Sequence, residues 1–193
     1  MKNIVVVSIL GFLAATASYA EDICRANLSN EDLMGEYRIA IGPGTLTIVT
    51  RKGARRVHAA PVMEGTATIA LYDGVPILYS DDLVVGGALE IRLRPAENDE
   101  KDLGFLDDPT IPTAGSEDVA FVLGCEIATD LPQLIGTGTV IGNGVTVPNS
   151  VHLMVYFQDD GGISAIGVYD STVISEAASG KIEFHVRFSM SSI

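Results

Sequence analysis

The chain has 193 residues, with 12 basic and 25 acidic side chains and a formal net charge of −13 at pH 7. This charge repels phosphate backbones and anionic membrane surfaces, so it argues against nucleic-acid binding and favours cationic ligands or basic partners. The length suits one domain that buries most of its apolar surface.

The first twenty residues have the pattern of a secretory signal peptide. Lys2 provides a short positive segment, an apolar run follows from Ile4 to Ala15, and the small residues Ser18 and Ala20 have the spacing of a cleavage site. No later apolar run reaches the roughly 18 to 20 residues of a membrane helix. We therefore expect an exported protein, periplasmic or extracellular and of bacterial source, whose domain over residues 21–193 has no membrane span once residues 1–20 are removed.

Two cysteines, Cys24 and Cys125, remain after cleavage. An even count in an oxidising compartment predicts one disulfide, which would close a loop of about 100 residues and contribute roughly 4 to 5 kcal/mol in the chain-entropy model. Two cysteines without paired spacing do not make a structural zinc site. We expect no metal and no cofactor.

The chain beyond Cys24 alternates apolar and polar residues with the period of β-strands, after one short helical turn that Ser29 would cap. Lys181–Met190 is the clearest example, with apolar residues at every second position. Strands are predicted at Tyr37–Ile41, Thr45–Thr50, Thr66–Tyr72, Pro76–Tyr79, Ala88–Arg94, Val119–Ile127, Thr137–Ile141, Val151–Phe157, Ile163–Tyr169 and Lys181–Met190.

Glycine-rich turns separate these strands. Four such turns are predicted, at residues 42–44, 72–74, 142–144 and 159–162. Short sequential strands joined by tight turns predict an all-β, antiparallel fold. An up-and-down barrel is the first choice and a β-sandwich the second.

The segment that opens the first strand, Leu33 to Ala40, resembles the first motif of lipocalins and related calycins. That motif is Gly-x-Trp, and here Gly35 is followed by Tyr37 in the tryptophan position. The resemblance implies a lipocalin-like barrel closed at one end that holds a small apolar ligand. The alternative is that Gly35 only begins a strand and Tyr37 is an ordinary core aromatic.

Two charged stretches interrupt the alternation. Residues 95–118 are rich in Asp and Glu and predict a solvated acidic loop. A basic stretch carries Arg51, Arg55, Arg56 and His58, which could receive an anionic ligand. Pairing with the acidic loop, or simple solvation, is the favoured interpretation, because exposed charge clusters seldom make a site.

Catalytic residues are hard to assemble, and none is assigned. His152 and Tyr156 share the polar face of one predicted strand, and Glu183 and His185 share that of another. These four residues would form an acid/base or metal site only if the two strands were close. The sequence therefore favours a protein that is not an enzyme.

The function that the sequence favours is a binding module for a small, partly apolar ligand, held by an apolar face that includes Tyr37, Phe121, Phe184 and Phe188. The second hypothesis is a protein-interaction or structural cell-envelope domain with a filled core, which would associate through its sheet edges. The third is a hydrolase or metal-dependent enzyme that uses His152 and His185.

Overall fold

The computed structural model describes residues 28–83, 87–101, 118, 120–121, 125, 131–142, 145–158, 161–175 and 180–193. Its strands are β1 (Gly35–Thr50), β2 (Arg55–Ala60), β3 (Met63–Tyr72), β4 (Val75–Ser80), β5 (Gly87–Pro95), β6 (Gln133–Gly142), β7 (Val145–Phe157), β8 (Ile163–Ser175) and β9 (Gly180–Ser192). All of the pairings are antiparallel.

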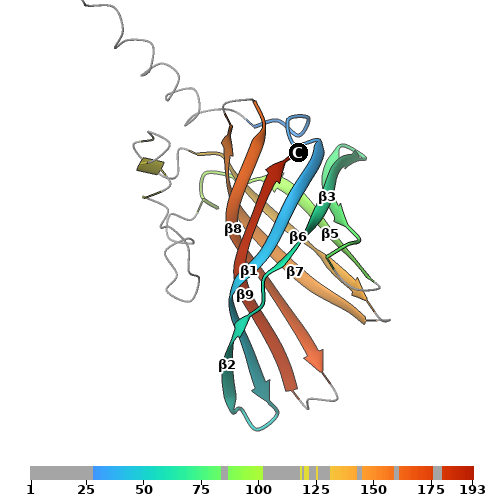
Figure 1. Cartoon of the computed structure of the whole chain (residues 1–193), viewed down its shortest axis with the longest axis vertical. Helices are drawn as coiled ribbons and strands as arrows, with labels where there is room; N and C mark the ends of the chain where they lie inside the picture. The colour runs from blue at the N-terminus through green and yellow to red at the C-terminus, as the bar shows by residue number, and fades with distance from the viewer. Residues whose placement is uncertain are drawn as a thin grey trace, which may run out of the picture.

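The sheet closes into a barrel because β1 pairs with β9 as well as with β2 and β3 (Figure 1). Residues 35–41 of β1 pair with β3 and residues 44–49 pair with β2, so β2 and β3 occupy one position in the wall. The nine strands therefore form an eight-position barrel. The predicted all-β, antiparallel up-and-down barrel is confirmed, and the sandwich is not formed.

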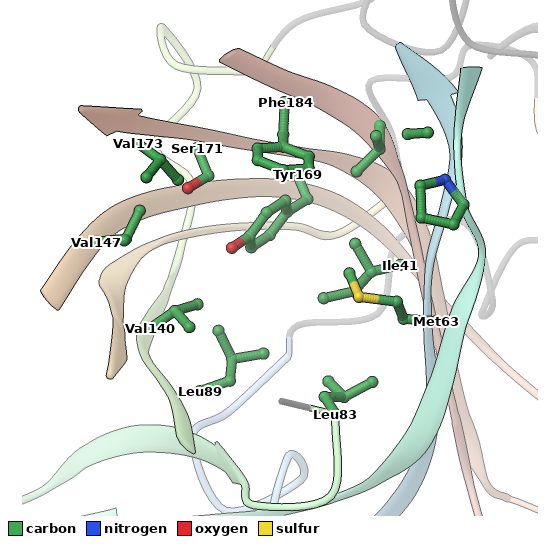
Figure 2. Close-up of a pocket in the computed structure, with 13 residues that line it drawn as sticks. Ile41, Met63, Leu83, Leu89, Val140, Val147, Tyr169, Ser171, Val173 and Phe184 are labelled. Atoms are coloured by element: carbon green, nitrogen blue, oxygen red, sulfur yellow. The ribbon is translucent and has the colours of Figure 1, made fainter. Parts of the chain in front are cut away.

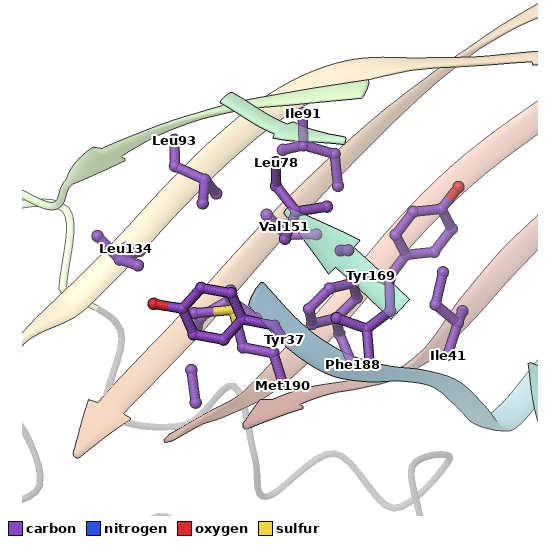
Figure 3. Packing of buried hydrophobic residues seen from close by; sticks show 14 of the residues in the cluster. Tyr37, Ile41, Leu78, Ile91, Leu93, Leu134, Val151, Tyr169, Phe188 and Met190 are labelled. Atoms are coloured by element: carbon purple, nitrogen blue, oxygen red, sulfur yellow. The ribbon is translucent and has the colours of Figure 1, made fainter. Parts of the chain in front are cut away.

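One end of the barrel has a solid apolar core. On β9 the predicted alternation is confirmed, since Val186, Phe188 and Met190 are 2%, 0% and 3% exposed. Figure 3 shows Phe188 and Met190 lying close to Tyr37 within this core. Alternating inward side chains from the other strands fill the remaining space.

The turn that precedes β1 covers this end of the barrel. Leu33 in that turn is fully buried, and the Tyr37 hydroxyl donates a 2.8 Å hydrogen bond to its carbonyl oxygen. Ser29 and Asp32 stabilise the turn, because the Asp32 carboxylate accepts bonds from the Ser29 amide (2.8 Å) and hydroxyl (2.7 Å). The N-terminal segment thus ties itself to the closed end through Tyr37.

The prediction of a turn at residues 42–44 is wrong. β1 continues through these residues, and its pairing with β9 moves from Ile41 opposite Phe188 to Gly44 opposite Val186. Two residues of β1 therefore face one residue of β9, which is a β-bulge. The extra residue exchanges the two faces of β1, so that Leu46 faces the same side as Ile41.

The strand predicted at Val119–Ile127 is also wrong where the structure describes it. Asp118, Ala120 and Phe121 are helical, and Cys125 is not in a strand. The apolar residues of this region pack on the outside of the barrel, where they form a second cluster with residues of β7 and β8: Ala120, Cys125, Leu131, Met154, Ile166 and Val168. Cys24 and residues 102–117 of the acidic loop lie outside the described residues, so the disulfide stays a prediction.

The other end of the barrel opens between two arms (Figure 1). The last pair between β7 and β8 is Asn149 opposite Ser171, and the two strands continue separately beyond it. The long arm comprises residues 44–50, 55–60, 171–175 and 180–186, and the short arm comprises residues 137–142 and 145–149. Strand β2 lies in the basic stretch, where no strand was predicted, and it forms because the second half of β1 extends beyond the barrel and pairs with it.

Candidate functional site

A cavity of about 210 Å³ lies where the two arms diverge. Strands of both arms line it, together with residues at the connection between β2 and β3 and with Leu83, which follows β4. The lining is almost wholly apolar: Ile41, Ala60, Pro61, Met63, Leu83, Leu89, Val140, Val147, Tyr169, Ser171, Val173, Phe184 and Val186. Figure 2 shows Tyr169 and Phe184 on one side of the cavity and Leu89 and Val140 on the other.

The β-bulge explains why the cavity has an apolar wall on β1 and β9. Before the bulge Ile41 faces inward, and after it Leu46 faces inward opposite Phe184. Without the extra residue, the alternation would direct Thr45 and Thr47 inward instead. The bulge therefore keeps this wall apolar beyond the end of the solid core.

The polar side-chain atoms of the lining are two hydroxyls on β8. Ser171 donates a 3.1 Å hydrogen bond to the carbonyl oxygen of Pro148 on β7. Burial raises the pKa of Tyr169, and a hydrogen bond with Ser171 works in the opposite direction. Tyr169 is only 6% exposed, so its hydroxyl is neutral at physiological pH. The cavity thus offers a neutral, apolar surface with one hydroxyl pair on its wall.

The size of the cavity restricts the ligand. An apolar cavity of roughly 150 Å³ in another protein holds benzene, whereas pockets for drug-sized ligands measure about 300 to 1,000 Å³. A volume of about 210 Å³ lies between the two. It fits a single ring with short substituents or a short acyl segment.

The four aromatic residues predicted to bind a ligand lie in three different places in the structure. Phe184 lines the cavity. Tyr37 and Phe188 are buried in the solid core at the closed end, where they leave no room for a ligand. Phe121 is 84% exposed on a helical turn, so its predicted place on the apolar face is wrong.

Several residues that line the cavity were missed by the sequence analysis. Tyr169 could have been found, because it follows Ile163 and Ala165 at alternate positions of a predicted strand. Val140 and Val147 pair with each other across β6 and β7, a register that a single sequence does not show. Leu83 lies outside the strands, where periodicity carries no information.

The four residues of the predicted polar site do not converge. His152 and Tyr156 lie on β7, Glu183 and His185 lie on β9, and β8 separates the two strands by about 9.6 Å in total. The rings bond locally instead, His152 Nε2 to Gln133 Oε1 (2.7 Å) and His185 Nδ1 to Asp170 Oδ1 (2.6 Å). Among the described residues, no three His, Cys, Asp or Glu side chains are grouped for a metal ion.

The basic stretch does not form one anion site either. Arg51 lies in the turn between β1 and β2, while Arg55 and Arg56 point to opposite faces of β2, with His58 on the face of Arg56. Arg55 forms a 3.2 Å ion pair with Glu183 on β9. The partner of Arg55 among the described residues is thus on β9.

Glu183 also forms a 2.6 Å ion pair with Lys181, two residues away on the same face of β9. The hydrogen bond from Lys181 and, secondarily, the charges of Lys181 and Arg55 lower the pKa of Glu183. Glu183 is therefore ionised and neutralised by two cations, which suits a structural role better than an acid/base role.

The beginning of the predicted acidic loop is ordered by an ion pair. Two nitrogens of Arg94 bond to the two carboxylate oxygens of Glu100 at 2.7 and 2.6 Å, and the amide of Glu97 donates to Glu100 at 2.9 Å. The bonds from Arg94 and then from Glu97 lower the pKa of Glu100 to about 2. This part of the loop is a tight turn at the end of β5.

Comparison with protein-family models finds none that matches the chain, and comparison with curated protein sequences finds no match. Within the part of the chain that the structure describes, no helix has the length and hydrophobicity needed to cross a membrane. The cavity at the open end is therefore the feature from which a function can be inferred.

Proposed function

We propose that this protein is an exported binding module that holds a small, apolar ligand in the cavity at the open end of its barrel. The observation that carries the proposal is the contrast between the two ends. Tyr37 and Phe188 fill the closed end, whereas the open end has an apolar hollow of about 210 Å³. A fold with no ligand would gain stability by filling such a hollow.

The cavity favours binding over chemistry. A serine nucleophile needs a neighbouring base, usually a histidine. Ser171 instead donates its proton to a backbone carbonyl, and no histidine is among the described residues that line the cavity. Tyr169 is neutral, and because Ser171 gives its own proton to Pro148, the Tyr169 proton is directed to Ser171 and the Tyr169 oxygen can accept one hydrogen bond from a ligand. We infer a ligand with an apolar ring or chain and at most one polar group. The separation of His152 from His185 gives no support to a hydrolase.

The resemblance to lipocalins and calycins is part of the proposal. It is supported by the barrel, by the burial of Tyr37 at the closed end and by the hydrogen bond from Tyr37 to the segment that covers this end. Export after cleavage of residues 1–20, into the periplasm or the extracellular space, and a disulfide between Cys24 and Cys125 belong to the same proposal.

The second candidate function is association with a protein partner through a sheet edge. Strand β2 is the last strand of the sheet order, and among the described strands it pairs with β1 alone. Residues 55–59 are all exposed, so its outer edge is open to a further strand.

Native mass spectrometry of protein purified from its own host separates the two candidates. A co-purifying small molecule supports the ligand-binding module, whereas ligand-free oligomers favour association through β2. Indole and 1-octanol, tested by calorimetry on the stripped protein, serve as defined apolar probes. Phe184→Ala should weaken their binding, while Phe121→Ala, which truncates an exposed Phe, should not. Equal binding by both variants would contradict the proposal.

A further inference from the structure

A second hollow lies on the outer wall of the barrel, away from the apolar cavity. This outer groove has a volume of about 520 Å³ and crosses β3, β1, β9, β8 and β7. Its floor consists of small side chains that neighbour one another across the strands. Ser191 pairs with Ser164, and Ala40 pairs with Ser189. Arg38, a longer residue beside this floor, pairs with Ser191. The groove exists because small residues in the middle of the wall are surrounded by longer ones.

The longer residues around the outer groove carry charge of mainly one sign. Arg38 on β1 and Arg187 on the neighbouring strand β9 line it, and Glu64 is the one carboxylate of its described lining. Two cations and one anion leave a local charge of +1 on a chain whose net charge is −13. The local excess of positive charge therefore runs against the composition of the whole chain.

Arg187 is the most informative residue of the groove. Its Nε is buried and has no hydrogen-bond partner in the part of the chain that the structure describes. A buried guanidinium donor without an acceptor costs free energy, and most such donors in folded proteins are satisfied. The same part of the chain gives Arg38 no side-chain partner either, so both guanidinium groups keep donors for a ligand.

Hydroxyl and amide groups complete one end of the groove. The Gln158 side-chain amide donates to Ser164 and, at 2.9 Å, to Ser191, and Ser164 and Ser191 lie 3.3 Å apart. This network fixes the hydroxyls and leaves the Gln158 carbonyl oxygen as an acceptor. Tyr156 flanks the same end. A ligand in the groove would meet guanidinium donors next to hydroxyl groups.

We propose that the outer groove binds a small oxyanion, a molecule bearing a carboxylate or phosphate group, with Arg187 and Arg38 as the anion-binding residues. Guanidinium groups match such anions because they donate parallel hydrogen bonds to two oxygens. The hydroxyls of Ser189 and Ser191 would bond to the remaining polar atoms. This site is independent of the apolar cavity, which lies inside the barrel.

The experiment follows the Nε–Hε signals of arginine by NMR in the full chain labelled with ¹⁵N. Inorganic phosphate and citrate are the two probes, and sodium chloride at the same ionic strength is the control. We expect a saturable shift of the Arg187 signal with at least one probe and none with chloride. The probe that saturates identifies phosphate or carboxylate as the preferred group. A linear response to both probes would overturn the proposal.

Three variants test which residues bind the anion. Arg187→Gln should weaken binding at least about tenfold, as expected for the loss of a charge-assisted hydrogen bond, and Arg38→Gln should weaken it severalfold. Arg92→Gln, which removes an exposed arginine from the outer face of β5, is the matched control and should leave binding unchanged. Equal losses in all three variants would show nonspecific attraction and overturn the site.

The stability of Arg187→Gln separates a binding role from a structural one. Because the Nε of Arg187 has no hydrogen-bond partner among the described residues, the variant should unfold at the same temperature as the wild type or higher. A clearly lower unfolding temperature would show that the guanidinium stabilises the fold, and would contradict the assignment of its free donor to a ligand.

Discussion

Filling the apolar cavity should stabilise the empty protein and abolish ligand binding at the same time. Val140 on β6 faces the cavity opposite Tyr169, as Figure 2 shows. Val140→Phe adds about four carbon atoms to this space, each of which contributes up to about 0.8 kcal/mol when fully buried. The arms leave the cavity partly open and the ring must fit among fixed neighbours, so we expect a net gain of about 1 kcal/mol.

The expected effect of a ligand on the wild type is larger. At about 24 cal/mol per Å³, the value for enclosed cavities, a volume of about 210 Å³ corresponds to at most roughly 5 kcal/mol of lost packing, and to less here because the arms leave the hollow partly open. Part of this is recovered when a ligand fills the cavity. A ligand at about 100 times its Kd stabilises the folded state by about 2.7 kcal/mol, which raises the unfolding temperature by roughly 5 to 10 °C for a chain of this size.

The assay is thermal unfolding followed by circular dichroism, with and without saturating indole. Val140→Phe without indole should unfold about 2 to 4 °C above the wild type, and indole should then have no effect. Val57→Phe makes the same change on the exposed side of β2, where Val57 is 63% exposed, and should keep the full response to indole. A response to indole that survives in Val140→Phe would refute the assignment of the ligand to this cavity.

Three further predictions concern the scaffold. Tyr37→Phe removes the 2.8 Å bond to the buried carbonyl of Leu33, so urea unfolding should show a loss of about 1 kcal/mol. Gly167→Ala would place a Cβ against a backbone carbonyl of β7, so the same measurement should show a loss of about 1 to 3 kcal/mol. Because Arg94 and the Glu97 amide lower the pKa of Glu100 from 4.5 to about 2, its contribution to stability is present above pH 4.5 and is lost as the pH falls towards 2. Glu100→Gln should therefore flatten the pH dependence of the unfolding temperature over that range, and an unchanged profile would contradict the role of this ion pair.

The barrel could be predicted from the sequence because alternation along one strand depends only on which side is buried. On β9 the inward positions Val186, Phe188 and Met190 are apolar and the outward positions are polar. The pattern therefore predicts both the strand and which of its faces is buried. Periodicity also placed Tyr37 inside the barrel.

The region around Phe121 shows where the same reasoning fails. Val119 to Ile127 alternates like a strand, yet Ala120 and Cys125 pack on the outside of β7 and β8 around Met154. Two apolar residues on the outward face of a barrel can be covered by a neighbouring segment, and a sequence does not show which surface an apolar residue meets. Phe121 consequently lies in solvent instead of in the barrel.

The position of the ligand site depends on the bulge in β1, and the bulge was predicted as a turn. Both structures need the backbone freedom of Gly42, which has a φ of +106°, so the local sequence does not distinguish them. What decides between them is the pairing partner: β9 runs beside both halves of β1, from Tyr37 opposite Ser192 to Thr50 opposite Gly180, and holds them in one continuous strand. A hairpin at Gly42 would have broken this ladder and removed the long arm.

With the strand continuous, the extra residue turns Leu46 towards Phe184, and the long arm presents an apolar face to the short arm. The hollow between the arms, and with it the proposed function, is therefore a consequence of a contact between residues about 140 positions apart in the chain.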